Sequence, residues 1–270
     1  MRISLAVGVL FLLGSVGLSQ DWAKSRLDKS PRHLEWVKVK QGDREVNCFV
    51  AYPEVKEKAT SVIVIHEIFG MTDWVRSVCD QLAEAGYVAI APDLLSGMAP
   101  GGGGTAELGR NVGTAIRDLK PEQITADLNA VGDYVTKLPA SNGKLAVTGY
   151  CWGGGQSFRF ATNRSDLKAA FVFYGMFNQT KDNLAKINCP VYGFYAEDDQ
   201  RINGTVPESD KLMKELGKTY EAVTYKGAGH GFFRAGEDPD GETKDKKHGA
   251  GNKKAREEAW VRLKDALKKI

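Results

Sequence analysis

The sequence predicts an α/β fold with a mostly parallel, twisted sheet, helices on both of its faces and an N-terminal antiparallel hairpin. Short apolar runs typical of buried strands alternate along the chain with longer segments of helical period. Such alternation builds a parallel sheet, and strands that are apolar throughout need helices on both faces. Ahead of these runs, residues 33–52 alternate between apolar and polar side chains around Gly42-Asp43, which predicts a hairpin.

The individual elements follow from the same two periods. Six short apolar runs predict buried strands, at residues 61–66, 87–91, 144–148, 169–174, 191–195 and 220–225. Five segments with apolar side chains three and four residues apart predict helices, at residues 73–85, 121–138, 154–163, 209–216 and 253–269. The four glycines at residues 101–104 and the polar residues 236–252 predict surface loops.

Composition indicates one globular domain. The chain has 270 residues, 42% of them hydrophobic, and no linker or repeat divides residues 21–270. A net charge of +3, dispersed along the chain, gives no indication of nucleic-acid binding. No spacing of His, Cys and Asp residues predicts a metal site.

The first twenty residues have the pattern of a secretory signal peptide. Arg2 precedes an apolar segment at residues 3–13, and small residues follow it. Because this segment is short for a membrane span, we expect cleavage near residues 19–21 and export to the periplasm or the medium, with no span in the mature chain. An uncleaved anchor is the alternative.

Export allows disulfides, and the chain has four cysteines. If Cys151 stays free, Cys48, Cys79 and Cys189 can form one bridge at most. Free cysteine is among the most buried residue types, so we expect three buried thiols.

Cys151 lies where a nucleophile elbow of the G-x-S-x-G type is expected. It follows the apolar run 145–147, and Gly149 and Gly153 flank it two residues away on either side. A turn from strand to helix this sharp leaves no room for a Cβ at the flanking positions. A buried structural cysteine is the alternative. The pattern predicts a nucleophilic thiol at the carboxyl end of a strand.

Two partners for this thiol follow later strands. Asp199 comes after the run 191–195 and His230 after the run 220–225, so the order is nucleophile, acid, histidine, as in α/β-hydrolases. His230 would take the thiol proton and Asp199 would orient the imidazole ring. Asp198 is the alternative acid. For the oxyanion we expect the backbone N–H groups of Trp152 and Ile68.

The chain resembles the dienelactone hydrolase family of the α/β-hydrolase fold. The resemblance extends over nearly all of the chain after the signal segment, and its most specific feature is a cysteine elbow combined with a Glu-Ile-Phe-Gly loop. The matching segments are residues 65–70 (IHEIFG), 89–94 (AIAPDL), 143–144 and 149–154 (GYCWGG), 196–202 (AEDDQRI) and 229–232 (GHGF).

The resemblance implies roles for further residues. It implies that Glu67 interacts with the thiol and with Arg234, that substrate binding frees Glu67 to accept the thiol proton, and that Arg234 meets a substrate carboxylate. A plain ion pair between Glu67 and Arg234 is the alternative. For a second arginine of the family, the positions Arg110 and Arg117 are both candidates, in a segment that does not match locally.

Four aromatic residues are candidates for the walls of an acyl pocket. They are Phe69, Trp74, Trp152 and Phe232. Trp74 falls on the apolar face of its helix and is as well explained by core packing. Trp152 is the better candidate because it adjoins the nucleophile, and His66 is expected to orient its loop by hydrogen bonding.

We therefore expect an exported, carboxymethylenebutenolidase-like hydrolase that cleaves a small ester or lactone with a Cys-His-Asp triad. It would need no cofactor or metal and would act as a monomer. Acyl transfer on the same triad is one alternative. The other is an exported module of weak activity that holds a ligand in its cleft.

Overall fold

A computed structural model describes residues 20–176 and 180–270. The predicted signal peptide at residues 1–20 therefore lies, apart from its last residue, outside the described residues. No helix within the described ranges is long and apolar enough to cross a membrane.

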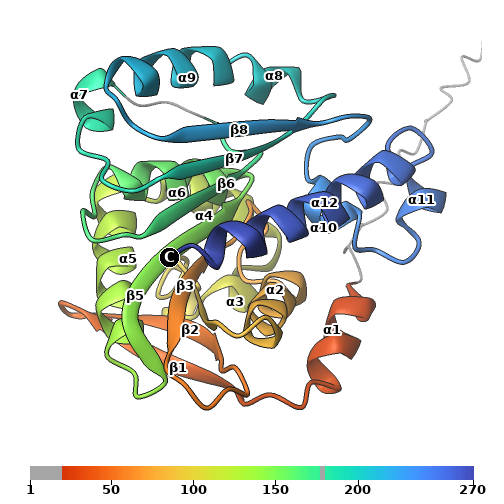
Figure 1. Cartoon of the computed structure of the whole chain (residues 1–270). Helices are drawn as coiled ribbons and strands as arrows, with labels where there is room; N and C mark the ends of the chain where they lie inside the picture. Colours follow the sequence, from red (N-terminus) through yellow and green to blue (C-terminus); the bar gives the residue numbers. More distant parts are fainter. Residues whose placement is uncertain (1–19, 177–179) are drawn as a thin grey trace, which may run out of the picture.

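An eight-stranded sheet forms the centre of the molecule, in the order β1-β2-β4-β3-β5-β6-β7-β8 (Figure 1). β2 pairs antiparallel with β1 and with β4, and the other neighbours are parallel. The predicted fold class, including its N-terminal hairpin, is thus confirmed. The strands are β1 (Leu34–Gln41), β2 (Arg44–Ala51), β3 (Ala59–Ile65), β4 (Val88–Pro92), β5 (Ser141–Tyr150), β6 (Ala169–Phe173), β7 (Val191–Ala196) and β8 (Tyr220–Tyr225).

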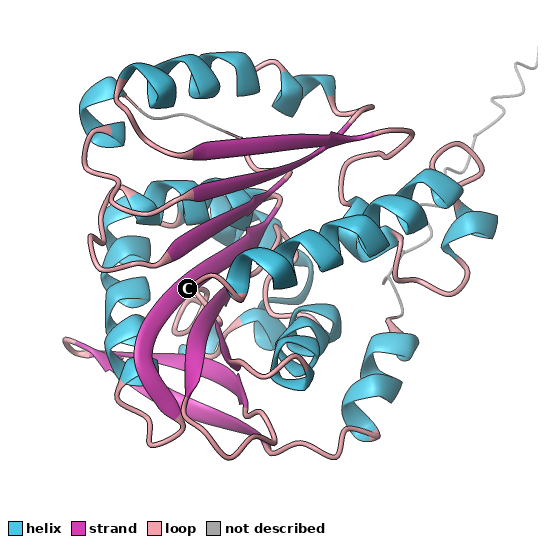
Figure 2. Cartoon of the chain, in the orientation of Figure 1, coloured by secondary structure: helices cyan, strands magenta, loops and turns pink. Residues whose placement is uncertain are grey.

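Helices cover both faces of this sheet, as its buried strands require (Figure 2). The helices α2 (Asp73–Glu84) and α12 (Gly249–Leu267) pack on one face, and α1 (Asp21–Asp28) packs against α2. On the other face lie α5 (Pro121–Thr136), α6 (Trp152–Ala161) and α9 (Val206–Glu215). The remaining helices are the four-residue α3 (Thr105–Leu108), α7 (Lys181–Leu184), α8 (Gln200–Asn203), α10 (Phe232–Ala235) and α11 (Gly241–Lys244), α4 (Val112–Asp118), and the 3₁₀ turns η1 (Pro100–Gly102) and η2 (Gly109–Asn111).

The prediction of loops was partly wrong. The polar residues 236–252 include α11 and the first turn of α12, and α1, α3, α4, α7, α8 and α10 were not predicted. Helices of four residues are too short to show a helical period, and glycine and asparagine in the first turn of α12 disfavour a helix by propensity. The glycines at residues 101–104 form a 3₁₀ turn and its connection to α3.

All four cysteines are free thiols in the structure. Cys48, Cys79 and Cys189 are buried, as expected, and burial raises the pKa of the Cys189 thiol to about 12. Cys151 differs from them because it is partly exposed.

Candidate active site

Cys151 is the turn between β5 and α6. Its φ of 54° is rare for a residue with a side chain, and its backbone N–H donates to the carbonyl of Phe173 on the neighbouring strand. A Cβ at Gly149 would lie 2.1 Å from the carbonyl oxygen of Gly153, and one at Gly153 would lie 2.4 Å from that of His66. The two glycines therefore allow the close approach of strand and helix that presents the sulfur.

Cys151, His230 and Asp199 form one chain of hydrogen bonds. The Nε2 atom of His230 lies 3.1 Å from the Cys151 sulfur, and its Nδ1 atom lies 2.5 Å from Oδ2 of Asp199. The Asp199 side chain is 7% exposed and that of His230 36% exposed. The acid is therefore shielded from water while the imidazole faces the solvent, which suits a group that exchanges protons with a substrate.

The two candidate acids, Asp198 and Asp199, differ in the groups that they contact. Asp198 points away from His230 and pairs with Lys247 at 2.7 Å and with Nε2 of His248 at 3.0 Å. Its backbone N–H donates to the carbonyl of Ala228, which ties the acid loop to the histidine loop. Adjacent carboxylates thus have different partners, and only Asp199 contacts the imidazole.

The surroundings of His230 favour its charged form. Burial lowers its pKa, but the hydrogen bonds with Asp199 and Cys151 outweigh burial and raise the pKa to about 10. The ring of Tyr174 packs edge-on against the imidazole at 5.2 Å. A protonated imidazole beside the sulfur is the arrangement that stabilises a thiolate.

Asp199→Asn is expected to move the alkaline limit of kcat/KM to lower pH. Activity that needs the imidazolium is present below the raised pKa of His230 and lost as pH rises through about 10. Removing the carboxylate removes one cause of the raised pKa of His230, so activity is lost at a lower pH. The pH profiles of wild type and variant measure this. Asp198→Asn is the matched control, and an equal shift in both variants contradicts the assignment.

Two backbone N–H groups are available at the predicted oxyanion position. Within the described residues, neither the N–H of Ile68 nor that of Trp152 donates to a protein acceptor. Both residues line the cleft at Cys151, and Ile68 is 43% exposed. Unpaired donors beside a nucleophile suit the binding of a developing oxyanion.

Glu67 and Arg234 form a largely buried ion pair. Nε of Arg234 lies 2.7 Å from Oε2 of Glu67, and the two side chains are 20% and 3% exposed. The guanidinium also lies over the ring of Phe69, 5.3 Å from its centre. No hydrogen bond joins Glu67 to Cys151 among the described residues. The implied contact with Arg234 is therefore present, whereas the implied interaction with the thiol stays a prediction.

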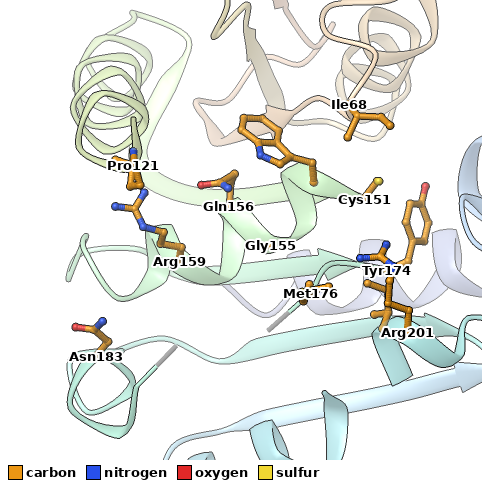
Figure 3. A pocket seen from close by; sticks show the side chains of 12 residues that line it. Ile68, Pro121, Cys151, Gly155, Gln156, Arg159, Tyr174, Met176, Asn183 and Arg201 are labelled. Carbon is orange, nitrogen blue, oxygen red and sulfur yellow. Dashed lines mark hydrogen bonds between the residues drawn. The ribbon is translucent and has the colours of Figure 1, made fainter. Parts of the chain in front are cut away.

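The sulfur opens into a cleft of about 600 Å³ (Figure 3). Of the predicted site residues, the cleft is lined by Cys151, Ile68 and Trp152. The sequence did not reveal its other walls, among them Tyr174, Gln156, Arg159 and Arg201. For Arg159 a signal was present, because residues 152, 156 and 159 recur at the helical spacing that follows the elbow.

Several predicted substrate contacts lie outside the lining of this cleft. Phe232 is fully buried against Tyr174, and Trp74 is a buried core residue. Arg110 lies in the exposed turn η2 and Arg117 at the end of α4. Spacing along the chain indicates how far these arginines lie from the elbow in sequence but not the direction of the intervening helices, and a substrate contact for either arginine stays a prediction.

His66 holds the loop that carries Glu67 and Ile68. Its Nδ1 atom lies 2.8 Å from the carbonyl oxygen of Glu67, and its ring stacks on Trp152 at 5.4 Å. Burial lowers the pKa of His66, which keeps the ring neutral. These contacts agree with the expected orienting role.

The sequence as a whole matches a family model described as the dienelactone hydrolase family, over residues 46–270. The chain belongs to the dienelactone hydrolase family. Family membership makes it a hydrolase of the carboxylic ester class, which confirms the predicted resemblance and enzyme class.

Individual relatives agree with this assignment. A Salmonella typhi protein named as a carboxymethylenebutenolidase is 30% identical over 203 residues, covering 71% of this chain and 74% of its own. One of the same name from Saccharolobus solfataricus is 29% identical, covering 84% and 95%. A crystal structure from Klebsiella pneumoniae, titled as a dienelactone hydrolase, has a TM-score of 0.73 at 24% identity and covers 88% of this chain and 99% of its own. This last likeness shows that the fold is shared.

Proposed function

We propose that this dienelactone hydrolase family member cleaves an ester or lactone through a thioester on Cys151. The observation that carries the proposal is the continuous hydrogen-bonded chain from Asp199 through His230 to the Cys151 sulfur, at the mouth of a cleft. Nucleophile, base and orienting acid are the three parts that covalent acyl transfer needs.

In the first half-reaction, the Cys151 sulfur attacks the carbonyl carbon as a thiolate, paired with protonated His230. The electron pair of the carbonyl moves to oxygen, where the N–H groups of Ile68 and Trp152 stabilise the charge. The helix α6 begins at Trp152, and the positive end of its dipole there also stabilises negative charge on the carbonyl oxygen. The intermediate collapses, the bond to the leaving oxygen breaks, and His230 gives that oxygen its proton.

In the second half-reaction, neutral His230 takes a proton from a water molecule as the water oxygen attacks the thioester. The carbon–sulfur bond breaks and the carboxylic acid leaves. The sulfur returns to a thiolate beside the imidazolium, so the starting state is restored without any external oxidant, reductant or metal. Throughout, the buried Asp199 holds the ring in the orientation that both proton transfers need.

We further propose that the pair of Glu67 and Arg234 responds to the substrate. Both groups are largely buried, so a partner that competes for the guanidinium leaves the carboxylate with an uncompensated charge. In molecules where Cys151 is still a neutral thiol beside protonated His230, a substrate carboxylate at Arg234 would release Glu67 to accept the thiol proton, which supplies the thiolate with which the first half-reaction begins. The family resemblance and the ion pair at 2.7 Å support this proposal.

We also propose that the enzyme acts after export. The support is the sequence of its first twenty residues, with Arg2 ahead of the apolar residues 3–13.

Trapping of the thioester tests the proposed reaction. The protein is mixed with short-chain aryl esters and with lactones, quenched in acid, digested and examined by mass spectrometry. We expect an acyl adduct on the peptide that holds Cys151. Release of the aryl alcohol with an adduct only elsewhere, or with none at any quench time, argues against a Cys151 thioester. Added alcohol distinguishes hydrolysis from acyl transfer by the products that form.

A further inference from the structure

Two cationic side chains in the active-site cleft form no ion pair with a carboxylate of the described residues. Among the described residues, neither Arg159 nor Arg201 lies within ion-pairing distance of a carboxylate, whereas Arg234 pairs with Glu67. No aspartate or glutamate belongs to the described lining of the cleft. An unneutralised positive charge in a concave site attracts anions and raises their local concentration. The cleft is therefore electrostatically suited to a negatively charged occupant.

The cleft runs along one side of α6. Its lining passes from Cys151 to Gln156 and then to Arg159, and Figure 3 shows Arg159 beside Pro121, well away from the sulfur. With a rise of about 1.5 Å per residue, Arg159 lies roughly 12 Å along the helix axis from Cys151. In the same view Arg201 lies near Tyr174, on the side of the sulfur. One free charge is thus distant from the reacting atoms and the other is close to them.

Arg159 is held in place for recognition. Its Nη1 atom donates to the carbonyl of Pro121 at 2.7 Å, which fixes the guanidinium and leaves other N–H groups free. Desolvation lowers its pKa, although Glu122 opposes this, so the charge has lost part of its hydration. A fixed, partly desolvated guanidinium gains more from a carboxylate than a mobile, hydrated one.

Gln156, which lies between Cys151 and Arg159 along α6, adds a polar side chain to the cleft. Gln156 lines the cleft, and its Oε1 atom is buried without a hydrogen-bond partner. This oxygen is covered by protein, so it is the amide side chain as a whole that faces the cleft. The wall between Cys151 and Arg159 therefore includes one amide side chain.

We propose that the acyl arm of the substrate is elongated and ends in a carboxylate, which Arg159 binds. The acyl arm is the part that stays bonded to sulfur after the first half-reaction, so we place it in the cleft that continues from the sulfur. Arg201 raises the attraction for any anion near the mouth. The substrate class is thus an ester of a long dicarboxylic acid with its far end free, and this inference rests on the proposed Cys151 chemistry.

A series of aryl esters tests the proposal. The substrates are p-nitrophenyl monoesters of dicarboxylic acids from succinic to sebacic acid, each compared with the same ester methylated at its far carboxyl group. We expect kcat/KM to favour the free carboxylate most for the long members. Arg159→Gln should remove this preference, lowering kcat/KM by roughly 10- to 100-fold through KM, as for a lost charge-assisted hydrogen bond. The same variant should leave kcat/KM for the methylated esters unchanged.

Two other variants separate local recognition from general charge. Arg201→Gln should weaken all anionic members alike, without regard to length. Lys168→Gln removes one exposed positive charge at the end of the sheet opposite Cys151, and it should leave kcat/KM for every ester unchanged. Equal loss in Arg159→Gln and Lys168→Gln, or equal rates for free and methylated long esters in wild type, overturns the proposal while the Cys151 reaction stands.

A binding measurement keeps the test independent of turnover. Suberate, the acid that hydrolysis of one such ester releases, should protect Cys151 from alkylation by iodoacetamide in wild type and much less in Arg159→Gln. Neutral esters of about the size of methyl octanoate are compared with suberate in the same alkylation experiment. Absence of protection by suberate overturns the inference, whereas protection without hydrolysis of any ester counts against the proposed function alone.

Discussion

Cys151→Ala is expected to lower kcat for ester hydrolysis by about 10⁵- to 10⁶-fold, as removal of the nucleophile does in other triad hydrolases. The variant keeps the cleft, the free N–H groups of Ile68 and Trp152, and the pair of His230 and Asp199. It loses the sulfur atom that we propose forms the covalent intermediate. KM should change little, because the sulfur contributes mainly to the reaction and little to binding.

The measurement is steady-state hydrolysis of a short aryl ester, with circular dichroism to confirm folding. Cys189→Ala is the matched control, because this thiol is buried in the core cluster that also includes Phe158 and Phe160 of α6, and it forms no hydrogen bond with His230 among the described residues. Unchanged kcat in Cys151→Ala would assign the nucleophile elsewhere. A loss of similar size in Cys189→Ala would show that the effect is structural.

Much of this site was predictable because its parts sit at strand ends. The elbow around Cys151 has a sequence signature, since Gly149 and Gly153 are required by the backbone contacts that a Cβ would prevent. Asp199 and His230 follow buried strands, and the carboxyl ends of parallel strands meet at one edge of a sheet. Position along the chain therefore determined position in space.

Other features depend on packing that no local pattern reports. Whether Asp198 or Asp199 faces the imidazole is decided by the turn after β7, and here Lys247 and His248, nearly fifty residues away, hold Asp198 aside. The arginines of the cleft are a second case. Arg159 shares the helical spacing of Trp152 and Gln156, but that spacing does not say what the shared face meets, and only the position of α5 and the cleft beside it shows what Arg159 faces.

Gly153→Ala is expected to have a large effect on stability. The added Cβ would lie 2.4 Å from the carbonyl oxygen of His66 and 2.5 Å from that of Ile65, both backbone atoms at the end of β3. Relief requires α6 to move away from the sheet, so we expect a loss of about 3 kcal/mol in the free energy of unfolding, at the upper end of the usual range for overpacking. For a chain of this length that lowers Tm by roughly 6–12 °C.

The same displacement should lower activity, because Cys151 starts the helix that must move, while His230 is held by a different strand end. An error of about 1 Å in such a geometry costs on the order of 10²-fold in rate. Gly113→Ala is the control: a Cβ there meets nothing within 4 Å and lies inside α4. It should leave kcat unchanged and stabilise by about 0.4–1 kcal/mol. Thermal unfolding of both variants measures the contrast. Equal Tm values would mean that the elbow tolerates a side chain at residue 153, and that steric exclusion does not explain the glycine.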